Sequence, residues 1–391
     1  MTMIKEKTSL VSHLQCSACD KKYDHMESQT VASCAQCQKS PLLTHYDLQN
    51  GLGLEDIQVE ERSMWRYRAV LPLLNNNNKV SLGEGWTPLL PMGRLASRYG
   101  LSSLLVKDES ANPTGSFKAR GLSMAVSKAK ELGVEACIVP TAGNAGGALS
   151  AYCAKAGMRA IVVMPSHTPE AFKKECRYFG AELVEVDGLI SDCARKVAEI
   201  KYGKECFDIS TMKEPYRLEG KKTMGYEIAE QMNWKLPDVI LYPTGGGTGL
   251  IGMWKAFHEM KAMGWIKGKF PRMIAVQSEN CKPIVMSYEG RQQDASRYKG
   301  SATFANGLAV PHPFAEKLIL QVIRQSNGTA IAVSDEAIQK AMKEIASAEG
   351  MLVCPEGAAL WPALKTLIDE GEVDREETIL LLNTGSAYKY L

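Results

Sequence analysis

One lysine of this chain stands in a context that suits covalent chemistry. Lys118 follows the Pro113–Gly115 turn and Phe117, and it precedes a helix-like run from Gly121 to Leu132. A lysine that forms a Schiff base needs a fixed position and a lowered pKa, and partial burial supplies both. The alternative is a lysine whose apolar stem covers a helix start while its charge stays in water. If other segments of the chain could bind the molecule that reacts with this lysine, they favour the first interpretation.

A run of glycine and threonine lies between the apolar, strand-like Val239–Tyr242 and the helix-like Leu250–Met260. Consecutive glycines let backbone N–H groups converge, and the helix N-terminus adds partial positive charge, so the run suits a phosphate ester. Its residues are Gly245, Gly246, Gly247, Thr248 and Gly249. The run matches neither a Walker A loop nor a G-x-G-x-x-G fingerprint after a first strand. A plain strand-to-helix turn, the alternative, needs fewer glycines.

Two more strand ends carry polar side chains. Asn144 lies between the strand-like Ala136–Val139 and the helix-like Ala148–Ala156, where its amide could bond a phenolate-like oxygen or simply cap a turn. Thr384 follows the strand-like Thr378–Leu382 and could offer its hydroxyl to a ring nitrogen. In open α/β sheets ligands bind beyond the carboxyl ends of the strands, so these side chains are candidates for one site.

From Leu104 onward, strand-like and helix-like segments alternate, which predicts an α/β fold with parallel sheets and helices on both faces. The predicted strands are Leu104–Lys107, Ala136–Val139, Ala160–Met164, Glu182–Val186, Val239–Tyr242, Met273–Gln277, Thr329–Val333 and Thr378–Leu382. The predicted helices are Gly121–Leu132, Ala148–Ala156, Pro169–Phe179, Ile190–Ile200, Lys222–Asn233, Leu250–Met260, Asp335–Ala348 and Gly357–Ile368. The polar stretch Gln292–Phe304 is predicted to be a loop near the site.

The N-terminal part carries a metal-site pattern, two C-x-x-C pairs with fourteen residues between them: Cys16, Cys19, Cys34 and Cys37. Two such pairs suit tetrahedral zinc, as in a zinc ribbon, and four thiolates close the coordination shell, so the metal would be structural. The alternative is a ribbon that folds without metal, because Asp20 and Gln38 stand where such knuckles usually have glycine. We expect His13, His25 and His45 to be bystanders.

Composition excludes several classes of function. The chain has 391 residues, with 46 basic against 44 acidic residues and a formal net charge of +2. This balance gives no electrostatic footprint for nucleic acid or an anionic membrane. No apolar run reaches the roughly 18 residues of a membrane span, and Met1–Leu10 lacks a secretory h-region, so we expect a cytoplasmic protein. The scattered cysteines fit a reducing compartment.

Lys118, the asparagine segment, the glycine run and Thr384, in this order, resemble the fold-type-II pyridoxal-phosphate enzymes, whose fold is like that of the tryptophan synthase β chain. Further segments resemble the threonine synthases of that family: Ser63–Tyr67, Ser81–Leu89, Lys107–Glu109 and Glu219–Thr223. The resemblance covers nearly the whole chain. It implies two parallel-sheet α/β domains behind the zinc-ribbon-like module of residues 1–50. The large domain would comprise residues 51–110 and 211–391, and the small domain residues 111–210.

The resemblance also implies a role for each candidate residue. Lys118 would hold pyridoxal 5′-phosphate as a Schiff base, and Asn144 would bond its 3′-oxygen. The run Gly245, Gly246, Gly247, Thr248 and Gly249 would hold its phosphate, and Thr384 would face its pyridine nitrogen. Because a hydroxyl does not enforce protonation of that nitrogen, the lysine would do more of the proton handling.

The implied reaction converts the amino acid O-phosphohomoserine and water to threonine and phosphate in a homodimeric enzyme. Lys107 and Arg120 are candidates for binding the leaving phosphate. Two departures put the substrate in doubt. Ala142-Gly143-Asn144-Ala145 replaces the family's Ser-Gly-Asn-Thr, and Thr384-Gly385-Ser386-Ala387-Tyr388-Lys389 replaces Thr-Gly-His-Gly-Leu-Lys. A serine/threonine ammonia-lyase, a β-replacing synthase such as cysteate synthase, and a catalytically silent binding module therefore stay open.

Overall fold

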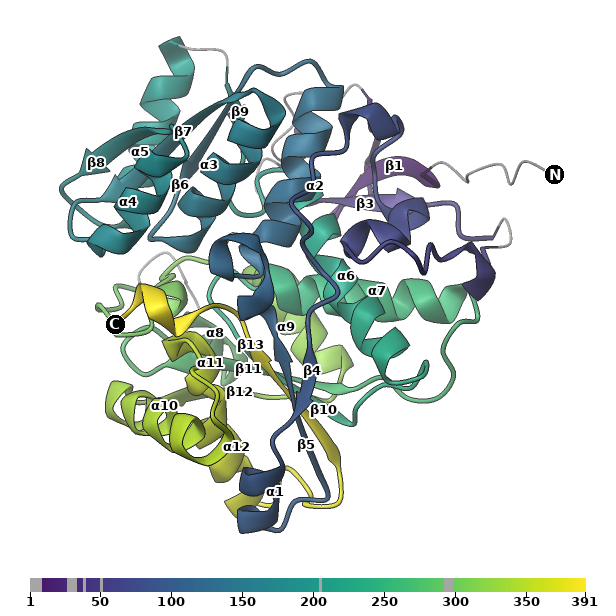
Figure 1. Cartoon of the computed structure of the whole chain (residues 1–391), viewed down its shortest axis with the longest axis vertical. Coiled ribbons are helices and arrows are strands. Elements are labelled where there is room, and N and C mark those ends of the chain that lie inside the picture. Colours follow the sequence, from purple (N-terminus) through teal and green to yellow (C-terminus); the bar gives the residue numbers. More distant parts are fainter. Residues whose placement is uncertain (1–8, 27–33, 38–39, 50–51, 204–205, 292–297) are drawn as a thin grey trace.

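The computed structural model describes residues 9–26, 34–37, 40–49, 52–203, 206–291 and 298–391. Within these ranges the strands form a six-stranded sheet of order β12-β11-β10-β13-β5-β4, a four-stranded sheet of order β8-β7-β6-β9, and a three-stranded sheet of order β2-β1-β3 (Figure 1). The larger two sheets are parallel except for the edge strand β4, and the three-stranded sheet is antiparallel. The first part of the predicted loop Gln292–Phe304, residues 292–297, lies outside the described residues.

The strands are β1 (Val11–Cys16), β2 (Lys22–Tyr23), β3 (Leu42–Tyr46), β4 (Leu89–Pro91), β5 (Ser103–Asp108), β6 (Ala136–Pro140), β7 (Arg159–Pro165), β8 (Glu182–Val186), β9 (Phe207–Asp208), β10 (Val239–Pro243), β11 (Arg272–Ser278), β12 (Ala330–Val333) and β13 (Thr378–Asn383). The helices are α1 (Gly93–Tyr99), α2 (Lys118–Glu131), α3 (Asn144–Ala156), α4 (Glu170–Tyr178), α5 (Ile190–Gly203), α6 (Tyr216–Gln231), α7 (Thr248–Ala262), α8 (Pro283–Tyr288), α9 (Glu316–Gln325), α10 (Asp335–Glu349), α11 (Pro355–Ala358) and α12 (Leu360–Asp369).

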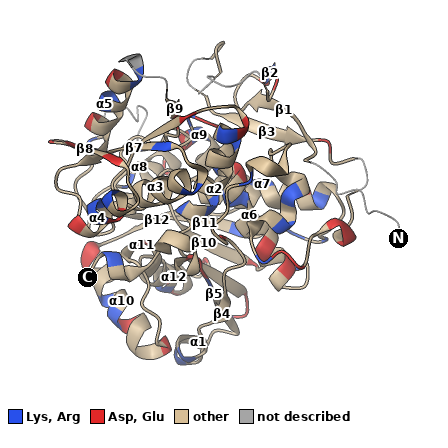
Figure 2. Cartoon of the chain, turned by 45° about the horizontal axis from the view of Figure 1, so that its top comes forward, with Lys and Arg blue, Asp and Glu red and all other residues tan. Residues whose placement is uncertain are grey.

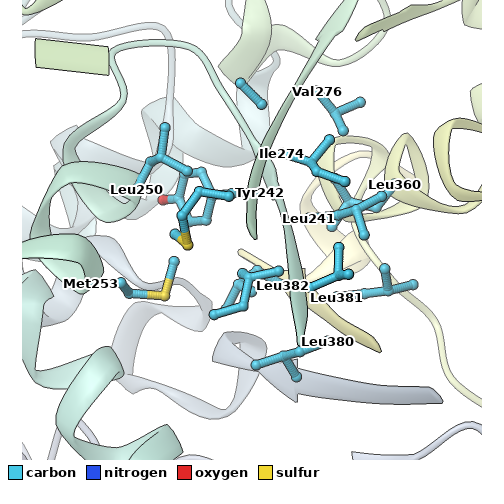
Figure 3. Close-up of a cluster of buried hydrophobic side chains, with 14 of the residues drawn as sticks. Leu241, Tyr242, Leu250, Met253, Ile274, Val276, Leu360, Leu380, Leu381 and Leu382 are labelled. Atoms are coloured by element: carbon cyan, nitrogen blue, oxygen red, sulfur yellow. The ribbon is translucent and has the colours of Figure 1, made fainter. Parts of the chain in front are cut away.

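The core of the large sheet explains its long apolar strands. In β13 the side chains from Ile379 to Leu382 are all buried, as expected for a parallel strand covered on both faces. Figure 3 shows Leu250 and Met253 of α7 on one side of the strands and Leu360 of α12 on the other. The helices α10, α11 and α12 cover one face of the sheet, and α7 and α9 cover the opposite face (Figure 1).

The small sheet divides its side chains by alternation. Ile138, Ile161 and Val163 pack with α5 in one cluster, whereas their neighbours Val139 and Val162 pack with α2, α3 and α4 in another. Successive side chains of a strand point to opposite faces, so helices on both sides are required to bury them. Three residues separate the carboxyl end of β6, Pro140, from α3, which begins at Asn144.

The α/β class predicted from the sequence is confirmed: two largely parallel sheets are covered by helices on both faces, and a small antiparallel sheet precedes them. Three helices that lead out of the site, α2, α3 and α6, begin three to six residues earlier than predicted. The predicted helix Gly357–Ile368 is two helices, α11 and α12, because Pro362 lacks the N–H that would bond the carbonyl of Ala358. The predicted domain boundaries stay a prediction, although β6, β7, β8 and β9 all fall within residues 111–210.

Acidic and basic residues are interspersed on the outer helices, for example along α5 and α10 (Figure 2). This mixture agrees with the near-neutral net charge of +2. Among the described residues, no helix is both long enough and apolar enough to serve as a membrane span.

Candidate active site

The candidate residues gather at one edge of the large sheet. β13 pairs in parallel with both β10 and β5, so the carboxyl ends of these three strands lie side by side. β10 leads into the glycine run and β13 into Thr384, while the chain after β5 leads to Lys118. The N–H of Phe117 donates to the carbonyl of Thr384 at 3.1 Å, and Ser116 forms an antiparallel bridge with Gly385. Lys118 is therefore tied to the end of β13.

The backbone before Lys118 is a sharply bent turn. Thr114 and Gly115 have φ angles of 59° and 60°, in the left-handed region, and Ser116 returns to an extended conformation. This sequence of conformations lets α2 begin at Lys118 with the lysine beside the strand ends. The hydroxyl oxygens of Thr114 and Ser116 are buried and have no hydrogen-bond partner in the described part of the chain. Buried hydroxyls without partners are uncommon, and they suit a site that binds a polar ligand.

The amine of Lys118 is electrostatically prepared for Schiff-base chemistry. Burial and, second, the nearby guanidinium of Arg217 lower the pKa of Lys118 to about 7, while Glu356 opposes the shift. A neutral amine is therefore well populated near pH 7. The same amine lies 4.0 Å from the centroid of the Phe117 ring, which restricts its position. The predicted properties of this lysine, fixed position and lowered pKa, are both present.

The glycine run forms a backbone cradle at the start of α7. Within the described residues, the N–H groups of Gly245, Gly246 and Gly247 have no protein acceptor, and the first turn of α7 adds the free N–H groups of a helix start. Gly247 has a φ of 70°, which favours glycine. A Cβ on Gly246 would lie 2.9 Å from Cγ2 of Thr211. The loop is therefore held against the protein on one side while its amides stay available for an anion.

Asn144 is the first residue of α3, and its side chain has a defined neighbour. Nζ of Lys389 donates to Oδ1 of Asn144 at 3.3 Å, and the side chain of Asn144 also interacts with the hydroxyl of Tyr390. The amide nitrogen of Asn144 lies 3.5 Å from the position that a Cβ on Gly385 would take. Asn144 thus lies next to the Ser116–Gly385 bridge, which directly precedes the start of α2.

Thr384 has a neighbour that sequence reasoning missed. Its hydroxyl oxygen lies 3.7 Å from Sγ of Cys354, which caps the N-terminus of α11. Burial raises the pKa of Cys354 far above its usual value, so the thiol stays protonated. The one signal in the sequence was the cysteine directly before Pro355, the usual place of a helix cap before a proline.

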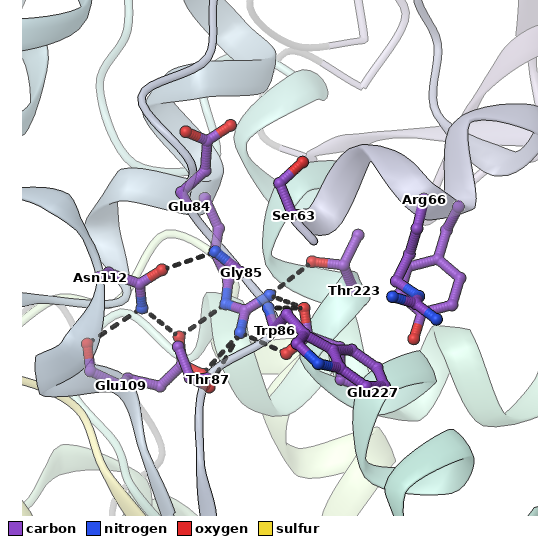
Figure 4. A network of polar contacts seen from close by, with 12 residues as sticks. Ser63, Arg66, Glu84, Gly85, Trp86, Thr87, Glu109, Asn112, Thr223 and Glu227 are labelled. Carbon is purple, nitrogen blue, oxygen red and sulfur yellow. Dashed lines mark hydrogen bonds and ion pairs between the residues drawn. The ribbon is translucent and has the colours of Figure 1, made fainter. Parts of the chain in front are cut away.

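Lys107 and Arg120 correct a sequence prediction, because neither is available to bind a leaving phosphate. Both side chains are fully buried, and the guanidinium of Arg120 bonds the carboxylates of Glu109 and Glu227 at 2.6–2.7 Å. Nζ of Lys107 lies 2.9 Å from Glu227. Figure 4 shows Glu109, Thr87 and Glu227 in this network, which joins the Ser81–Leu89 segment to α2 and α6. The network holds the fold together behind the site.

The four cysteines of the N-terminal part converge, with their sulfur atoms all within 4.8 Å of one another: Cys16, Cys19, Cys34 and Cys37. The thiols are free, so the cluster is not a pair of disulfides. Asp20 adopts a φ of 58°, which an aspartate tolerates in the place of a knuckle glycine. No histidine belongs to this cluster among the described residues, and Gln38 lies outside them. The donor set of four thiols is consistent with a tetrahedral metal site.

These residues fit pyridoxal phosphate. The free amides of Gly245, Gly246 and Gly247 suit its phosphate, the amine of Lys118 its carbonyl carbon, and the amide of Asn144 its 3′-oxygen. Lysine, phosphate cradle and strand-end hydroxyl at the carboxyl edge of a parallel sheet define the class of fold-type-II pyridoxal-phosphate enzymes.

Comparison with known proteins agrees with that class. The family described as "Pyridoxal-phosphate dependent enzyme" matches residues 80–385, and the chain belongs to this family. The threonine synthase of Methanocaldococcus jannaschii is 34% identical over 376 residues, which are 96% of this chain and 92% of the relative. The threonine synthase of Methanosarcina acetivorans is 34% identical over 379 residues, with the same shares covered. The chain is thus threonine synthase-like.

Solved structures support the fold. A maize serine racemase superimposes with a TM-score of 0.66 at 22% identity and covers 77% of this chain and 88% of its own. Diaminopropionate ammonia lyase from Escherichia coli superimposes with a TM-score of 0.66 at 18% identity and covers 81% and 90%. These similarities concern the fold alone, because enzymes of different activity share it.

Proposed function

We propose that this protein is a threonine synthase, which converts O-phosphohomoserine and water to threonine and inorganic phosphate. The observation that carries the proposal is the 34% identity to two threonine synthases over 96% of the chain. The geometry supports it, because the glycine run, Thr384 and Lys118 follow strand ends that lie side by side, and the amine of Lys118 has a pKa of about 7.

The proposed chemistry divides between cofactor and protein. When bound, pyridoxal phosphate withdraws electrons from the α carbon of the amino acid. Lys118 then acts as the proton carrier: its Nζ takes a proton from the α carbon, later one from the β carbon, and returns protons as the product forms. Phosphate leaves from the γ carbon, and water adds at the β carbon. The hydroxyl of Thr384 would hold the ring nitrogen without protonating it, which would leave the proton handling to Lys118.

The substrate carboxylate has a proposed place at the start of α3. Within the described residues, the backbone N–H groups of Ala142, Asn144 and Ala145 donate to no protein acceptor. They lie at a helix N-terminus, which favours an anion. The alanines at 142 and 145 bring no hydroxyl, so backbone amides and Asn144 must bind the carboxylate. This departure is the observation that keeps an ammonia-lyase or a β-replacing synthase as the second candidate.

We further propose that the four-cysteine cluster binds one structural zinc ion and that the enzyme works as a cytoplasmic homodimer. The support for zinc is the convergence of the four sulfur atoms. The cluster lies in a module whose last strand, β3, brings the hydroxyl of Tyr46 to Glu219 of α6 at 2.6 Å. The metal would therefore stabilise a module that packs behind the active site and takes no part in chemistry.

A single panel of assays tests the proposed activity. The holoenzyme is incubated separately with O-phosphohomoserine, threonine, serine and phosphoserine, and inorganic phosphate, threonine and 2-oxo acids are measured. We expect equal amounts of phosphate and threonine from O-phosphohomoserine and little 2-oxobutanoate from threonine. Rapid 2-oxobutanoate formation from threonine without phosphate release would assign an ammonia-lyase. Turnover of phosphoserine with an added nucleophile would assign a β-replacing synthase, and no turnover at all a silent fold.

A further inference from the structure

Two buried cations of α6 have no carboxylate partner. Lys221 and Arg217 are each only 1% exposed, and they lie four residues apart, so both project from the same face of the helix. Within the described residues, no ion pair shorter than 4.0 Å forms on either of them. Nζ of Lys221 donates to the hydroxyl of Thr248 at 2.6 Å, and the guanidinium of Arg217 donates to the carbonyl of Ile209.

Two other buried lysines among the described residues are paired with carboxylates. Lys107 lies 2.9 Å from Glu227, and Lys222, the direct neighbour of Lys221, lies 2.6 Å from Glu219. A buried charge without a counter-charge destabilises the folded protein, because removing an ion from water is costly. Such groups are therefore rare unless a ligand neutralises them. Lys221 differs in this respect from its direct neighbour, and this difference needs an explanation.

The acid that most affects Lys221, Glu214, does not supply the missing counter-charge. Glu214 uses one carboxylate oxygen to accept hydrogen bonds from the N–H groups of Tyr216 and Arg217 at 2.7 and 3.0 Å, which caps the start of α6. Burial raises the pKa of Glu214 to about 7, against the opposing effect of Arg217. The carboxyl group of Glu214 is therefore only partly ionised near neutral pH. Nζ of Lys221 donates to Thr248 instead.

The packing of α6 brings Lys221 to the cofactor side of the site. A Cβ on Gly220 would lie 2.1 Å from the carbonyl oxygen of Arg120, so α6 and α2 touch backbone to backbone. Nζ of Lys221 lies 5.0 Å from the centroid of the Phe117 ring, and Nζ of Lys118 lies 4.0 Å from the same centroid. Lys221 therefore lies between the start of α2, which carries Lys118, and the start of α7, which carries the glycine run.

We propose that Lys221 is the cationic partner of a phosphate ester that lies on the Gly245–Gly249 loop. The inference rests on the proposed function only in that it takes the loop as a phosphate cradle. An ammonium offers three donors, of which Thr248 accepts one, so two remain for phosphate oxygens. The free amides of the loop and the helix start alone supply partial charges, whereas Lys221 supplies a full one.

The same cradle could receive a phosphate from two sources, the cofactor or the substrate and its released product. Burial lowers the pKa of Lys221 well below its usual value, and the neighbouring Arg217 and Lys118 lower it further. A phosphate dianion would reverse this shift and hold the lysine charged. The absence of a resident carboxylate is then functional, because an acid at this place would repel the ligand.

The test compares pyridoxal phosphate with pyridoxal, which lacks the phosphate, as ligands of the apoprotein. Lys221→Gln keeps a donor for Thr248 and removes the charge, and Lys221→Met is the second variant if the first does not fold. Lys343→Gln, an exposed position on α10, is the matched control for loss of one positive charge. We expect Lys221→Gln to weaken pyridoxal phosphate binding by about 10- to 100-fold and pyridoxal binding by less than about threefold.

The two sources of phosphate give different results. If the cofactor's phosphate is the ligand, the preference for pyridoxal phosphate over pyridoxal falls in Lys221→Gln. If the substrate's phosphate is the ligand, that preference stays, and the affinity of the holoenzyme for inorganic phosphate, measured by calorimetry, falls instead. These affinities do not depend on which amino acid is turned over, so the proposed activity can fail while this proposal stands.

A structural role for Lys221 predicts the opposite pattern. Removal of a buried, unpaired charge should leave the melting temperature of the apoprotein equal or higher in Lys221→Met, whereas loss of a structural contact should lower it. Equal weakening of pyridoxal and pyridoxal phosphate, together with a less stable apoprotein, would overturn the proposal. Unchanged affinities for pyridoxal phosphate and inorganic phosphate would overturn it as well.

Discussion

At the scale of single residues, the site is defined by cations that the protein does not neutralise. Burial is the largest cause that lowers the pKa of Lys118, Arg217 and Lys221. The charge of Arg217 further lowers the pKa of both lysines, and the charge of Lys118 further lowers that of Lys221. The buried cations behind the site are neutralised instead, as Arg120 is by Glu109 and Glu227. The difference separates residues that stabilise the fold from residues that await an anionic ligand.

The lowered pKa of Lys118 predicts how fast the apoprotein takes up its cofactor at different pH. A group whose pKa falls to about 7 is charged below that pH and neutral above it, and only the neutral amine attacks a carbonyl carbon. The rate at which the visible absorbance of the lysine-bound cofactor develops should rise from pH 6 to pH 8 with a midpoint of about 7.

Arg217→Gln provides the comparison, because it removes the neighbouring positive charge and should move the midpoint to higher pH. Both proteins experience the same titration of free pyridoxal phosphate, so the difference reports the lysine. A midpoint near the usual lysine value of about 10, or one that does not respond to Arg217→Gln, would contradict this account.

At the scale of secondary-structure elements, glycines set the distances between the helices that carry the site. Gly121 of α2 faces α6 so closely that a Cβ there would lie 3.0 Å from the carbonyl oxygen of Arg217. Gly252 of α7 would in the same way meet the backbone N of Lys222 at 3.0 Å. These contacts bring the starts of α2 and α7 together on either side of α6, so that Lys118 and the glycine run share one site.

The glycine run yields a prediction that depends on this close packing. In Gly246→Val the new Cβ would meet Cγ2 of Thr211 at 2.9 Å, so Thr211 or the loop must shift, and the branched side chain would crowd the amides of the loop. We expect the dissociation constant for pyridoxal phosphate, measured by fluorescence titration, to rise by at least about tenfold. Gly93→Val is the control, because no atom lies within 4 Å of its Cβ position. Equal affinities of the two variants would exclude the loop as the cradle.

The N-terminal module yields a prediction about metal. Protein prepared without chelator should contain one zinc per chain, and replacement of both Cys16 and Cys19 by serine should remove it. Because binding to four thiolates stabilises the folded module, proteolysis within residues 9–49 should become faster in this variant while the cofactor absorbance persists.

A zinc-free protein that folds fully but no longer binds amino acids would contradict the structural role of the metal. Absence of zinc from the parent protein, with all four thiols titratable, would show that the module folds without it. Cys281→Ser serves as the control, since this buried thiol lies outside the cluster.

At the scale of the whole molecule, the end of the chain joins the two parallel sheets. Nζ of Lys389 lies 2.8 Å from the carboxylate of Glu175 on α4, beside the small sheet, and 2.7 Å from the carbonyl of Thr114. The ring of Tyr390 packs on Phe172 of the same helix with centroids 5.5 Å apart. The tail therefore holds α4 against the part of the chain that carries Lys118.

A double-mutant cycle measures this connection. Lys389→Met and Glu175→Gln should show a coupling energy of about 1 kcal/mol in the free energy of unfolding, because the pair is mostly buried and charge-assisted. The exposed pair Lys196–Glu199 is the control and should show less than about 0.5 kcal/mol. A coupling energy for the tail pair no larger than that of the control would show that the tail does not hold the two halves together.

Much of this organisation could be predicted from sequence because it depends on local patterns. The buried strands of the large sheet are continuous apolar runs, so β10 and β13 were found to within one residue. The glycine run between β10 and α7 was identifiable from composition alone. Helix starts at Lys118 and Asn144 were missed, because a lysine or asparagine beside glycine has no strong local preference for a first helical turn.

Pairing over long sequence separations could not be predicted. Lys107 and Arg120 were expected at the leaving phosphate because they lie near the motif, yet Glu227, more than a hundred residues away, occupies both of them. Lys221 and Lys222 are neighbours in sequence, but their partners differ. Lys221 donates to Thr248 at the start of α7, whereas Lys222 forms an ion pair with Glu219. Only the packing of α6 against α2 and α7 distinguishes them.

The central claim is that Lys118 binds the cofactor, and chemical trapping tests it most directly. Reduction of the holoenzyme with borohydride makes the bond between the lysine and pyridoxal phosphate permanent, and mass spectrometry of the digest then locates the added mass. We predict the label on Lys118, and its loss together with all visible absorbance in Lys118→Ala. Label on Lys221, the other buried amine of the site, or an unchanged absorbance in Lys118→Ala, would contradict the account.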